Sequence, residues 1–284
     1  MEKIAFIIDS TVYLPAETIK EHDIDVISLN VIEGETTHKE TDIDNDFIFE
    51  RVNQKIRLTT SQPSPSEFSE VYEKRLKEGY TNILVLTLSK ELSGTYQSAL
   101  MARNMLSDPS KVTIFDTNNA AFGNELLAFQ VAEMIRAKTP LKDIIKRTEK
   151  MIAQANLLFT VENLFFLQKG GRLSITQALI GTVLKVKPII KIIDGKLKLY
   201  HKTRTYAKLY QFMIDEILND PNYSEDKTMH VRLVERNAQD SLDQLESMMK
   251  ERFPKAKLSV QHYIGPVFSV HIGPQGFGIA WTFE

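Results

Sequence analysis

The sequence contains no cysteine. This absence excludes disulfide bonds, cysteine-ligated zinc and a thiol nucleophile, and it fits a reducing compartment. The glycine patterns that cradle nucleotide phosphates are also missing: no G-x-x-x-x-G-K-S/T loop occurs, and the glycines near the C-terminus do not form G-x-G-x-x-G between a strand and a helix. The sequence therefore offers no recognisable way to bind ATP or a dinucleotide.

Long apolar runs and an excess of one charge are absent as well. No stretch approaches the roughly 20 apolar residues of a membrane helix, and the first apolar run, residues 4–8, is too short for a signal peptide and is broken by Asp9. The 35 Lys and Arg residues balance 37 Asp and Glu residues, for a net charge of −2, which disfavours nucleic acid as a partner. We expect a cytoplasmic globular protein of one large or two medium domains.

The first half of the chain alternates between strand and helix patterns. Alternation of this kind predicts a mainly parallel sheet flanked by helices on both faces. We assign residues 1–155 to an N-terminal α/β domain. The expected strands are 4–8, 26–32, 83–88 and 112–115, and the expected helices are 15–20, 47–53, 67–77, 95–106, 125–137 and 141–154.

The second half, residues 156–284, predicts an α+β domain with a mostly antiparallel sheet. Asp194-Gly195 is typical of a two-residue hairpin turn. The expected strands are 157–161, 189–193, 196–202, 231–234, 258–264, 268–272 and 278–283, and the expected helices are 206–218 and 241–252. The overall fold class is α/β, and a cleft between two such domains is a favoured ligand site.

The run T-S-Q-P-S-P-S-E-F at residues 60–68 holds more hydroxyl groups than a helix start requires. Ser64, Pro65 and Glu67 form a capping box with proline in the first helical turn. Thr60, Ser61 and Gln62 are not explained by that motif. We place them in a loop approaching the helix N-terminus, where free N–H groups and the helix dipole favour an anion.

A second candidate site follows the strand at 83–88. Ser93 stands where a helix N-cap is expected, and Gly94 allows close approach to the backbone. Ligands bind at the carboxyl ends of strands in open α/β sheets, although a plain N-cap serine explains Ser93 equally well. Together, Thr60 and Ser93 are candidates to hydrogen-bond one carboxylate. His271, in the expected strand 268–272, is either a core histidine or next to a functional turn formed by the glycines and proline that follow it.

Charge is concentrated between residues 163 and 210, where ten Lys and Arg residues face a single acid, Asp194. This segment is either a solvated face or a basic surface for an acidic partner or phosphorylated ligand. Arg172 follows two glycines and Arg204 lies between two threonines. A guanidinium group contacts phosphate bidentately, so these two residues are the better phosphate candidates.

Five stretches, taken in order, resemble the DegV family of fatty-acid-binding proteins over nearly the whole chain. They are D-S-T-V-Y-L-P (9–15), T-S-Q-P-S-P-S-E-F (60–68), L-S-G-T-Y-Q-S-A (92–99), L-Q-K-G-G-R-L-S (167–174) and G-P-V-F-S-V-H-I-G-P-Q-G-F-G (265–278). Each motif alone is weak, whereas the set is specific. This sequence departs from the family pattern at Tyr13, Thr117, Ile272 and Gln275.

The resemblance implies a two-domain carrier that holds one long-chain fatty acid in an apolar tunnel between its domains. It implies that Thr60 and Ser93 bind the carboxylate, with Ser61, the Gly94 backbone and His271 nearby. The bound fatty acid is the ligand, and no cofactor or metal is expected.

The resemblance also implies a partner. A separate fatty acid kinase phosphorylates the bound acid, and the carrier, itself not an enzyme, retains the acyl phosphate. Arg172 and Arg204 are implied to dock the kinase or contact the phosphate. Neither nucleic acid nor stable membrane insertion is expected.

These implications agree with elementary energetics. A buried carboxylate needs several hydrogen-bond donors, and each buried CH₂ group supplies about 0.8 kcal/mol of affinity. Apolar residues that could line such a tunnel, or equally serve as core, are Phe122, Phe129, Leu164, Phe165, Phe166, Leu179, Ile180, Leu184 and Phe268.

Two other functions remain as alternatives. A serine hydrolase acting on a lipid ester would use Ser93 and His271 with Asp9 or Asp116, but the G-x-S-x-G elbow is missing. A nucleic-acid-binding module would use the basic segment 163–210, but the sequence shows no helix-turn-helix or aromatic stacking platform.

Overall fold

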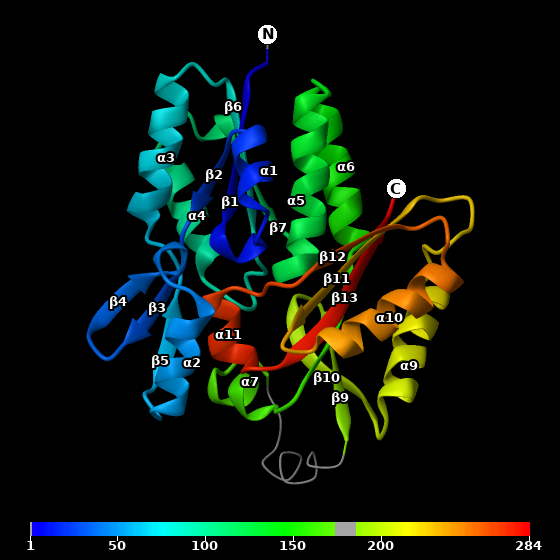
Figure 1. Ribbon diagram of the computed structural model, residues 1–284. Coiled ribbons are helices and arrows are strands. Elements are labelled where there is room, and N and C mark those ends of the chain that lie inside the picture. The colour runs from blue at the N-terminus through cyan, green and yellow to red at the C-terminus, as the bar shows by residue number, and fades with distance from the viewer. Residues whose placement is uncertain (1, 174–185) are drawn as a thin grey trace.

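The structure is a computed structural model, and it describes residues 2–173 and 186–284. These residues form two larger sheets and one small sheet (Figure 1). The expected tunnel residues Leu179, Ile180 and Leu184 lie outside the described residues.

The first half is built on a parallel sheet of β2 (Ile24–Ile27), β1 (Ile4–Asp9), β6 (Asn82–Thr87) and β7 (Val112–Asp116), in that spatial order. The strands β1 and β6 are almost wholly apolar because both faces of the sheet are covered. Phe6 and Ile8 pack into one apolar cluster, and Ala5 and Ile7 pack into another. This alternation follows from the two-residue period of a strand.

Helices cover both faces of this parallel sheet (Figure 1). On one side lie α1 (Ala16–Glu21), α5 (Ala121–Arg136) and α6 (Leu141–Gln154), and on the other lie α3 (Pro65–Lys77) and α4 (Thr95–Met105). The short 3₁₀ helices η1 (Ser10–Val12) and η3 (Pro109–Lys111) precede α1 and β7. The expected alternating architecture is therefore confirmed.

The chain between β2 and α3, called here the excursion, forms a small antiparallel sheet. Its strands are β4 (Thr36–Lys39), β3 (Asn30–Glu33) and β5 (Leu58–Ser61), accompanied by η2 (Glu40–Asp42) and α2 (Asn45–Asn53). The single strand expected over 26–32 is wrong because the Leu29 N–H donates to Ser10 Oγ (2.9 Å), outside any ladder, and the chain changes sheets there. Thr60 and Ser61 lie in β5 rather than in the expected loop.

The second half is a six-stranded sheet of β10 (Lys196–Thr203), β9 (Lys187–Ile193), β8 (Asn156–Val161), β13 (Gly276–Phe283), β11 (Met229–Arg236) and β12 (Lys257–Gln261), in spatial order. All neighbours are antiparallel except β11 and β12. Asp194 and Gly195 have φ values of 52° and 75°, which a type I′ hairpin requires, so the predicted β9–β10 turn is confirmed.

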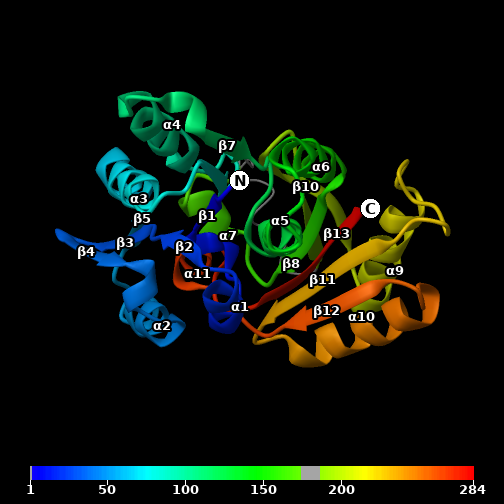
Figure 2. The same ribbon diagram turned by 90° about the horizontal axis from the view of Figure 1, so that it is seen from above.

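Helices α9 (Tyr206–Leu218) and α10 (Gln239–Arg252) cover one face of this sheet, and α5 lies against the other (Figure 2). Because α5 also contacts β1 and β6, it separates the two sheets. The mostly antiparallel second sheet is confirmed. The domain boundary at residue 155 stays a prediction, placed where α6 ends and β8 begins.

The strand expected over 268–272 is wrong: this segment belongs to helix α11 (Pro266–Ile272). Proline at its N-terminus suits a first helical turn, and Gly273, with φ 81°, ends it. Val267 and His271, four residues apart, face the same side of the helix. The helix packs against β5, α2 and the short helix α7 (Phe165–Lys169), contacts that the local sequence does not reveal.

Candidate functional site

A narrow cavity, called here the inner cavity, lies between the two halves. The space between its walls totals about 860 Å³, part of it open to solvent, but the centre of a water molecule can move through only about 70 Å³. Most of its described lining is apolar and buried, including Phe122, Phe159 and Val267. Such a space fits a slender apolar chain better than a broad ring system.

The tunnel residues named from the sequence are divided by the structure. Phe122 and Phe268 line the inner cavity, and so does Ile272, one of the departures from the family pattern. Leu164 is buried in a neighbouring apolar cluster without lining it. Phe129, at 38% exposure, and Phe165, at 46%, are surface residues.

Seven polar residues are among the described lining of the inner cavity; one of them, Thr160, is buried in β8. We call the other six the polar mouth: Thr60, Ser61, Gln62, Ser93, Arg172 and His271. Five of the six are half-buried or exposed, whereas His271 is buried. The polar mouth is therefore open to solvent, whereas most of the apolar lining is buried. Of the predicted site residues, Thr60, Ser61, Ser93, Arg172 and His271 are brought together here. Gly94 and Arg204 are not among the lining residues.

Thr60 and His271 form a direct pair across two elements. Thr60 Oγ1 in β5 lies 2.8 Å from His271 Nε2 in α11. Burial, with a smaller contribution from the Arg172 charge, lowers the pKa of His271 to about 3. The imidazole is therefore neutral at physiological pH and contributes hydrogen bonds but no charge.

The K-G-G-R turn after α7 is shaped around this histidine. A Cβ atom at Gly170 would lie 2.2 Å from His271 Nδ1, so only glycine lets the ring pack there. Gly171 has φ +71° and meets no neighbour within 4 Å, so its requirement comes from the backbone alone. Gly170 is therefore required by close packing and Gly171 by its backbone conformation. Both lie in the turn that places Arg172 beside His271.

Arg172 is held by backbone carbonyl groups. Its Nε donates to the Leu92 carbonyl oxygen (3.2 Å) and its Nη1 to the Gly170 carbonyl oxygen (2.7 Å). No carboxylate within the described ranges pairs with it. Burial lowers the pKa of Arg172, yet a guanidinium group stays protonated in proteins. The polar mouth thus contains a half-buried cation without an acidic partner.

Ser93 differs from the expectation in detail. The N-cap of α4 is Gly94, with no side-chain cap, and Ser93 precedes it. Ser93 Oγ lies 2.9 Å from Thr95 Oγ1. A Cβ atom at Gly94 would lie 2.9 Å from Gln62 Nε2, so the glycine makes room for Gln62. The sequence singled out Gln62 together with Thr60 and Ser61, but Gln62 was not predicted to bind the carboxylate.

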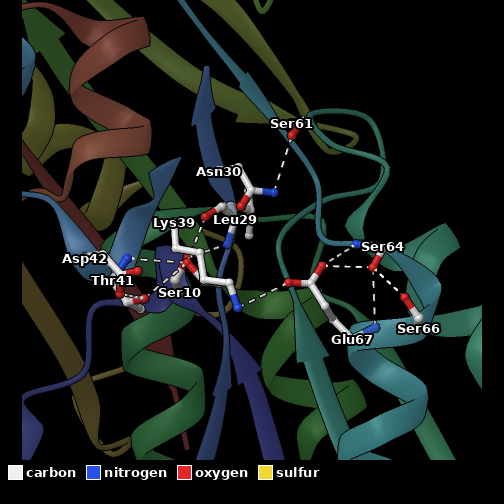
Figure 3. Close-up of polar contacts among 11 residues, drawn as sticks. Ser10, Leu29, Asn30, Lys39, Thr41, Asp42, Ser61, Ser64, Ser66 and Glu67 are labelled. Atoms are coloured by element: carbon white, nitrogen blue, oxygen red, sulfur yellow. Dashed lines mark hydrogen bonds and ion pairs between the residues drawn. The ribbon is translucent and has the colours of Figure 1, made fainter. Parts of the chain in front are cut away.

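The hydroxyl-rich run of β5 and α3 divides between two roles (Figure 3). Ser64 accepts from the Glu67 N–H, and Glu67 accepts from the Ser64 N–H at 2.8 Å, so the predicted capping box is confirmed. Ser61 Oγ accepts instead from Asn30 Nδ2 (3.4 Å) in β3. The hydroxyls of β5 therefore remain outside the helix cap.

Arg204 lies apart from the polar mouth. It is exposed on the turn between β10 and α9. The basic segment around it is also partly neutralised, because Lys191 pairs with Glu216 (2.7 Å) and Lys196 pairs with Glu91 (3.1 Å). The segment is therefore less cationic in the folded chain than its sequence suggests.

The hydrolase arrangement is not assembled in the described structure. Ser93 contacts Thr95, and His271 contacts Thr60. The Asp9 carboxylate accepts from the Leu88 N–H (2.7 Å) and from Thr11, and burial raises the pKa of Asp9 to about 6. The other candidate acid, Asp116, pairs with Lys90 (3.1 Å). The candidate members of the triad thus have partners other than one another.

Sequence reasoning missed a buried contact behind α11. The Glu40 carboxylate accepts from the Tyr13 hydroxyl (2.8 Å), from the Val267 N–H (2.9 Å) and from the Ser10 hydroxyl. Glu40 is 4% exposed, and burial raises its pKa to about 7. It joins η1 to the first turn of the helix that carries His271. Tyr13, a departure from the family pattern, is one of its donors.

Within residues 2–173 and 186–284, no group of three or more His, Cys, Asp or Glu side chains is arranged to hold a metal ion. Within the same ranges, every helix is too short or too polar to serve as a membrane span.

Comparison with known proteins places this geometry in a family. The DegV family model, described as "Uncharacterised protein, DegV family", matches residues 3–284. Protein DegV of Bacillus subtilis is 34% identical over 285 residues, covering 99% of each chain. Two solved structures also superpose over nearly their full lengths.

One is a DegV family protein from Thermus thermophilus described as fatty acid binding, with a TM-score of 0.89 and 26% identity, covering 99% of this chain and 100% of that one. The other is a stearic acid-binding protein from Eubacterium ventriosum, with a TM-score of 0.86 and 25% identity, covering 100% of this chain and 98% of that one. Because sequence and fold agree from end to end, the chain belongs to the DegV family.

Proposed function

We propose that this chain is a carrier that binds one long-chain fatty acid in the inner cavity, with the carboxylate at the polar mouth. One observation carries the proposal: a narrow apolar cavity ends in a partly exposed group of hydroxyl, imidazole and guanidinium side chains. The fatty acid binding described for the relatives from T. thermophilus and E. ventriosum supports the same class of ligand.

The two ends of the ligand have different roles. The tail supplies affinity, at about 0.8 kcal/mol for each buried CH₂ group. The hydroxyls of Thr60, Ser61 and Ser93 and the neutral His271 are positioned to hydrogen-bond the head, with the Gly94 backbone as a further donor. Among the described lining residues of the inner cavity, Arg172 alone carries a positive charge. A carboxylate there would compensate the unpaired guanidinium.

We further propose that a separate fatty acid kinase acts on the bound acid. The kinase binds ATP and transfers its terminal phosphoryl group to a carboxylate oxygen, which gives ADP and an acyl phosphate that stays on the carrier. The partly exposed polar mouth supports this role, because a partner can reach the head while the tail stays buried. Arg204, which is exposed, is proposed as a docking contact for the kinase.

The first test is the ligand carried by the purified chain. Native mass spectrometry is expected to show one long-chain fatty acid per chain, released on denaturation. Thr60→Val combined with Ser93→Ala is expected to weaken palmitate binding about tenfold or more, since two hydrogen bonds to a charged group are lost.

Thr37→Val is the matched control, because it removes the same hydroxyl from an exposed position of the same small sheet. All variants should melt cooperatively. An empty chain that also fails to take up palmitate or oleate contradicts the proposal. Unchanged palmitate binding in the double variant would contradict only the assignment of Thr60 and Ser93 to the head group. It would leave the proposed fatty acid binding intact.

A further inference from the structure

A second, wider hollow, which we call the vestibule, lies against the polar mouth. The centre of a water molecule can move through about 500 Å³ of it, against about 70 Å³ of the inner cavity. It is lined by residues between 52 and 60, by α7 and its following turn, and by α11. Thr60, Arg172 and His271 line both the vestibule and the inner cavity. The two spaces therefore meet at these three side chains.

The vestibule is lined by cations without acids. Lys55, Arg57, Lys169 and Arg172 contribute to its described lining, whereas Asp and Glu do not. Lys55 and Arg57 are exposed, and neither pairs with an acid within the described ranges. Lys169 lies over the Phe165 ring at 5.7 Å. Positive charge thus accumulates beside the mouth with no counter-charge from the described chain.

The junction between the two spaces is also short of partners. Arg172 gives Nε and Nη1 to backbone carbonyls, which leaves its charge uncompensated. His271 is 8% exposed, and its Nδ1 has no hydrogen-bond partner in the described structure. A half-buried cation beside an unpartnered buried polar atom is costly unless an anion or another polar group completes it.

The number of cations decides which anion fits. A fatty acid carboxylate carries one negative charge, and Arg172 alone matches it. A phosphate monoester carries between one and two negative charges near neutral pH and adds three acceptor oxygens. Lys55 and Arg57, beyond the junction, are in excess for the carboxylate but suit a larger and more highly charged head.

We propose that the vestibule is a phosphate compartment: it holds the phosphate group of a phosphorylated long-chain acid while the tail remains in the inner cavity. Arg172 stands at the junction, and Lys55 and Arg57 contact the outer phosphate oxygens. The inference rests on the proposed fatty acid function. It assigns the phosphate to the segment between α2 and β5, which the sequence motifs left unassigned, and not to Arg204.

The test compares two ligands with the same number of carbons, palmitate and hexadecyl phosphate, by displacement of a fluorescent fatty acid from delipidated protein. Lys55→Gln combined with Arg57→Gln is expected to weaken hexadecyl phosphate about tenfold and palmitate less than about twofold. The control pair, Lys146→Gln and Arg147→Gln, removes the same charges from exposed positions on α6 and should change neither affinity.

The selective loss should shrink at high salt, because the contacts involve exposed charges. Inorganic phosphate alone, added as a third arm, is expected to compete weakly because it has no tail. An equal effect on both ligands, or none on hexadecyl phosphate, overturns the phosphate compartment but leaves fatty acid binding intact. Failure of the wild-type chain to bind palmitate contradicts the proposed function itself.

Discussion

At the scale of single residues, positive charge and neutral hydrogen bonds come from different side chains of the polar mouth. Arg172 carries the charge, while His271 is kept neutral by its burial and by that same arginine. If the histidine were protonated, two cations would crowd one carboxylate. In the proposed carrier, neutral donors would orient the head group and a single guanidinium group would balance its charge.

Glu40 leads to a prediction about pH. Burial raises its pKa from 4.5 to about 7, so the folded chain keeps a proton that the unfolded chain releases. The free energy of unfolding should therefore fall as the pH rises through the window from about 4.5 to 7. Glu40→Gln keeps an acceptor for Tyr13 and Val267 but does not titrate. Its free energy of unfolding should fall less between pH 5 and pH 8, by on the order of 2 kcal/mol.

Denaturant unfolding at the two pH values measures this difference. Glu70→Gln, at an exposed position on α3, is the matched control and should follow the wild-type slope. Asp9 and Glu125, whose pKa values burial raises to about 6 and about 7, still titrate in every variant, so some slope must remain. A Glu40→Gln slope equal to that of the wild type would contradict the prediction.

At the scale of elements, the K-G-G-R turn and α11 form one unit. Gly170→Ala places a Cβ atom 2.2 Å from His271 Nδ1, so the ring must move and its bond to Thr60 is lost. We expect a loss of about 1–3 kcal/mol in stability and weaker palmitate binding. Gly171→Ala meets no neighbour and should cost about 1 kcal/mol from its backbone alone, with binding retained.

A double-mutant cycle tests whether the cost of Gly170→Ala comes from its clash with His271. In a His271→Ala background the clash partner is gone, so Gly170→Ala should destabilise the chain much less than in the wild type. Thermal melts of the four proteins measure the coupling. Additive losses would show that Gly170 is required for some reason other than the histidine.

Some elements of the fold could be predicted from the sequence, and others could not. Regular parallel strands, the capping box at Ser64 and the Asp194-Gly195 hairpin carry their signals locally, and the structure confirms them. The helix at Pro266 was mistaken for a strand despite the proline in its first turn, because its residues are largely apolar and its contacts with β5 and α7 are distant in sequence. For the site, Thr60, Ser93 and His271 were visible as residue types, but Glu40 was not, because its partners are distant in sequence.

At the scale of the molecule, α5 is the helix that packs against both halves of the chain. It contacts both large sheets, and its buried Glu125 pairs with Arg232 of β11 at 2.8 Å. The described walls of the inner cavity come from both halves, and its polar mouth is open to solvent. In the proposed function, a partner enzyme would reach the head group at this mouth without the halves coming apart.

This geometry predicts a division of labour between two proteins. With a bacterial fatty acid kinase, ATP and palmitate, trapping by hydroxylamine should yield a palmitoyl hydroxamate only when both proteins are present. Arg204→Gln should slow the reaction at limiting carrier, with palmitate binding unchanged. Hydroxamate formed by this chain alone, or ester hydrolysis abolished by Ser93→Ala, would instead favour an enzyme.

The small sheet of β3, β4 and β5 has an evolutionary consequence. The chain leaves the parallel sheet after Ile27, forms this small sheet, and rejoins the first layer at Pro65, where α3 begins. The parallel sheet is therefore complete without the small sheet. Thr60, Lys55 and Arg57 all come from this excursion or from the segment that leads into β5. Descendants could therefore exchange one head-group chemistry for another by altering this excursion, while the ancestral sheets and the space for the tail are inherited unchanged.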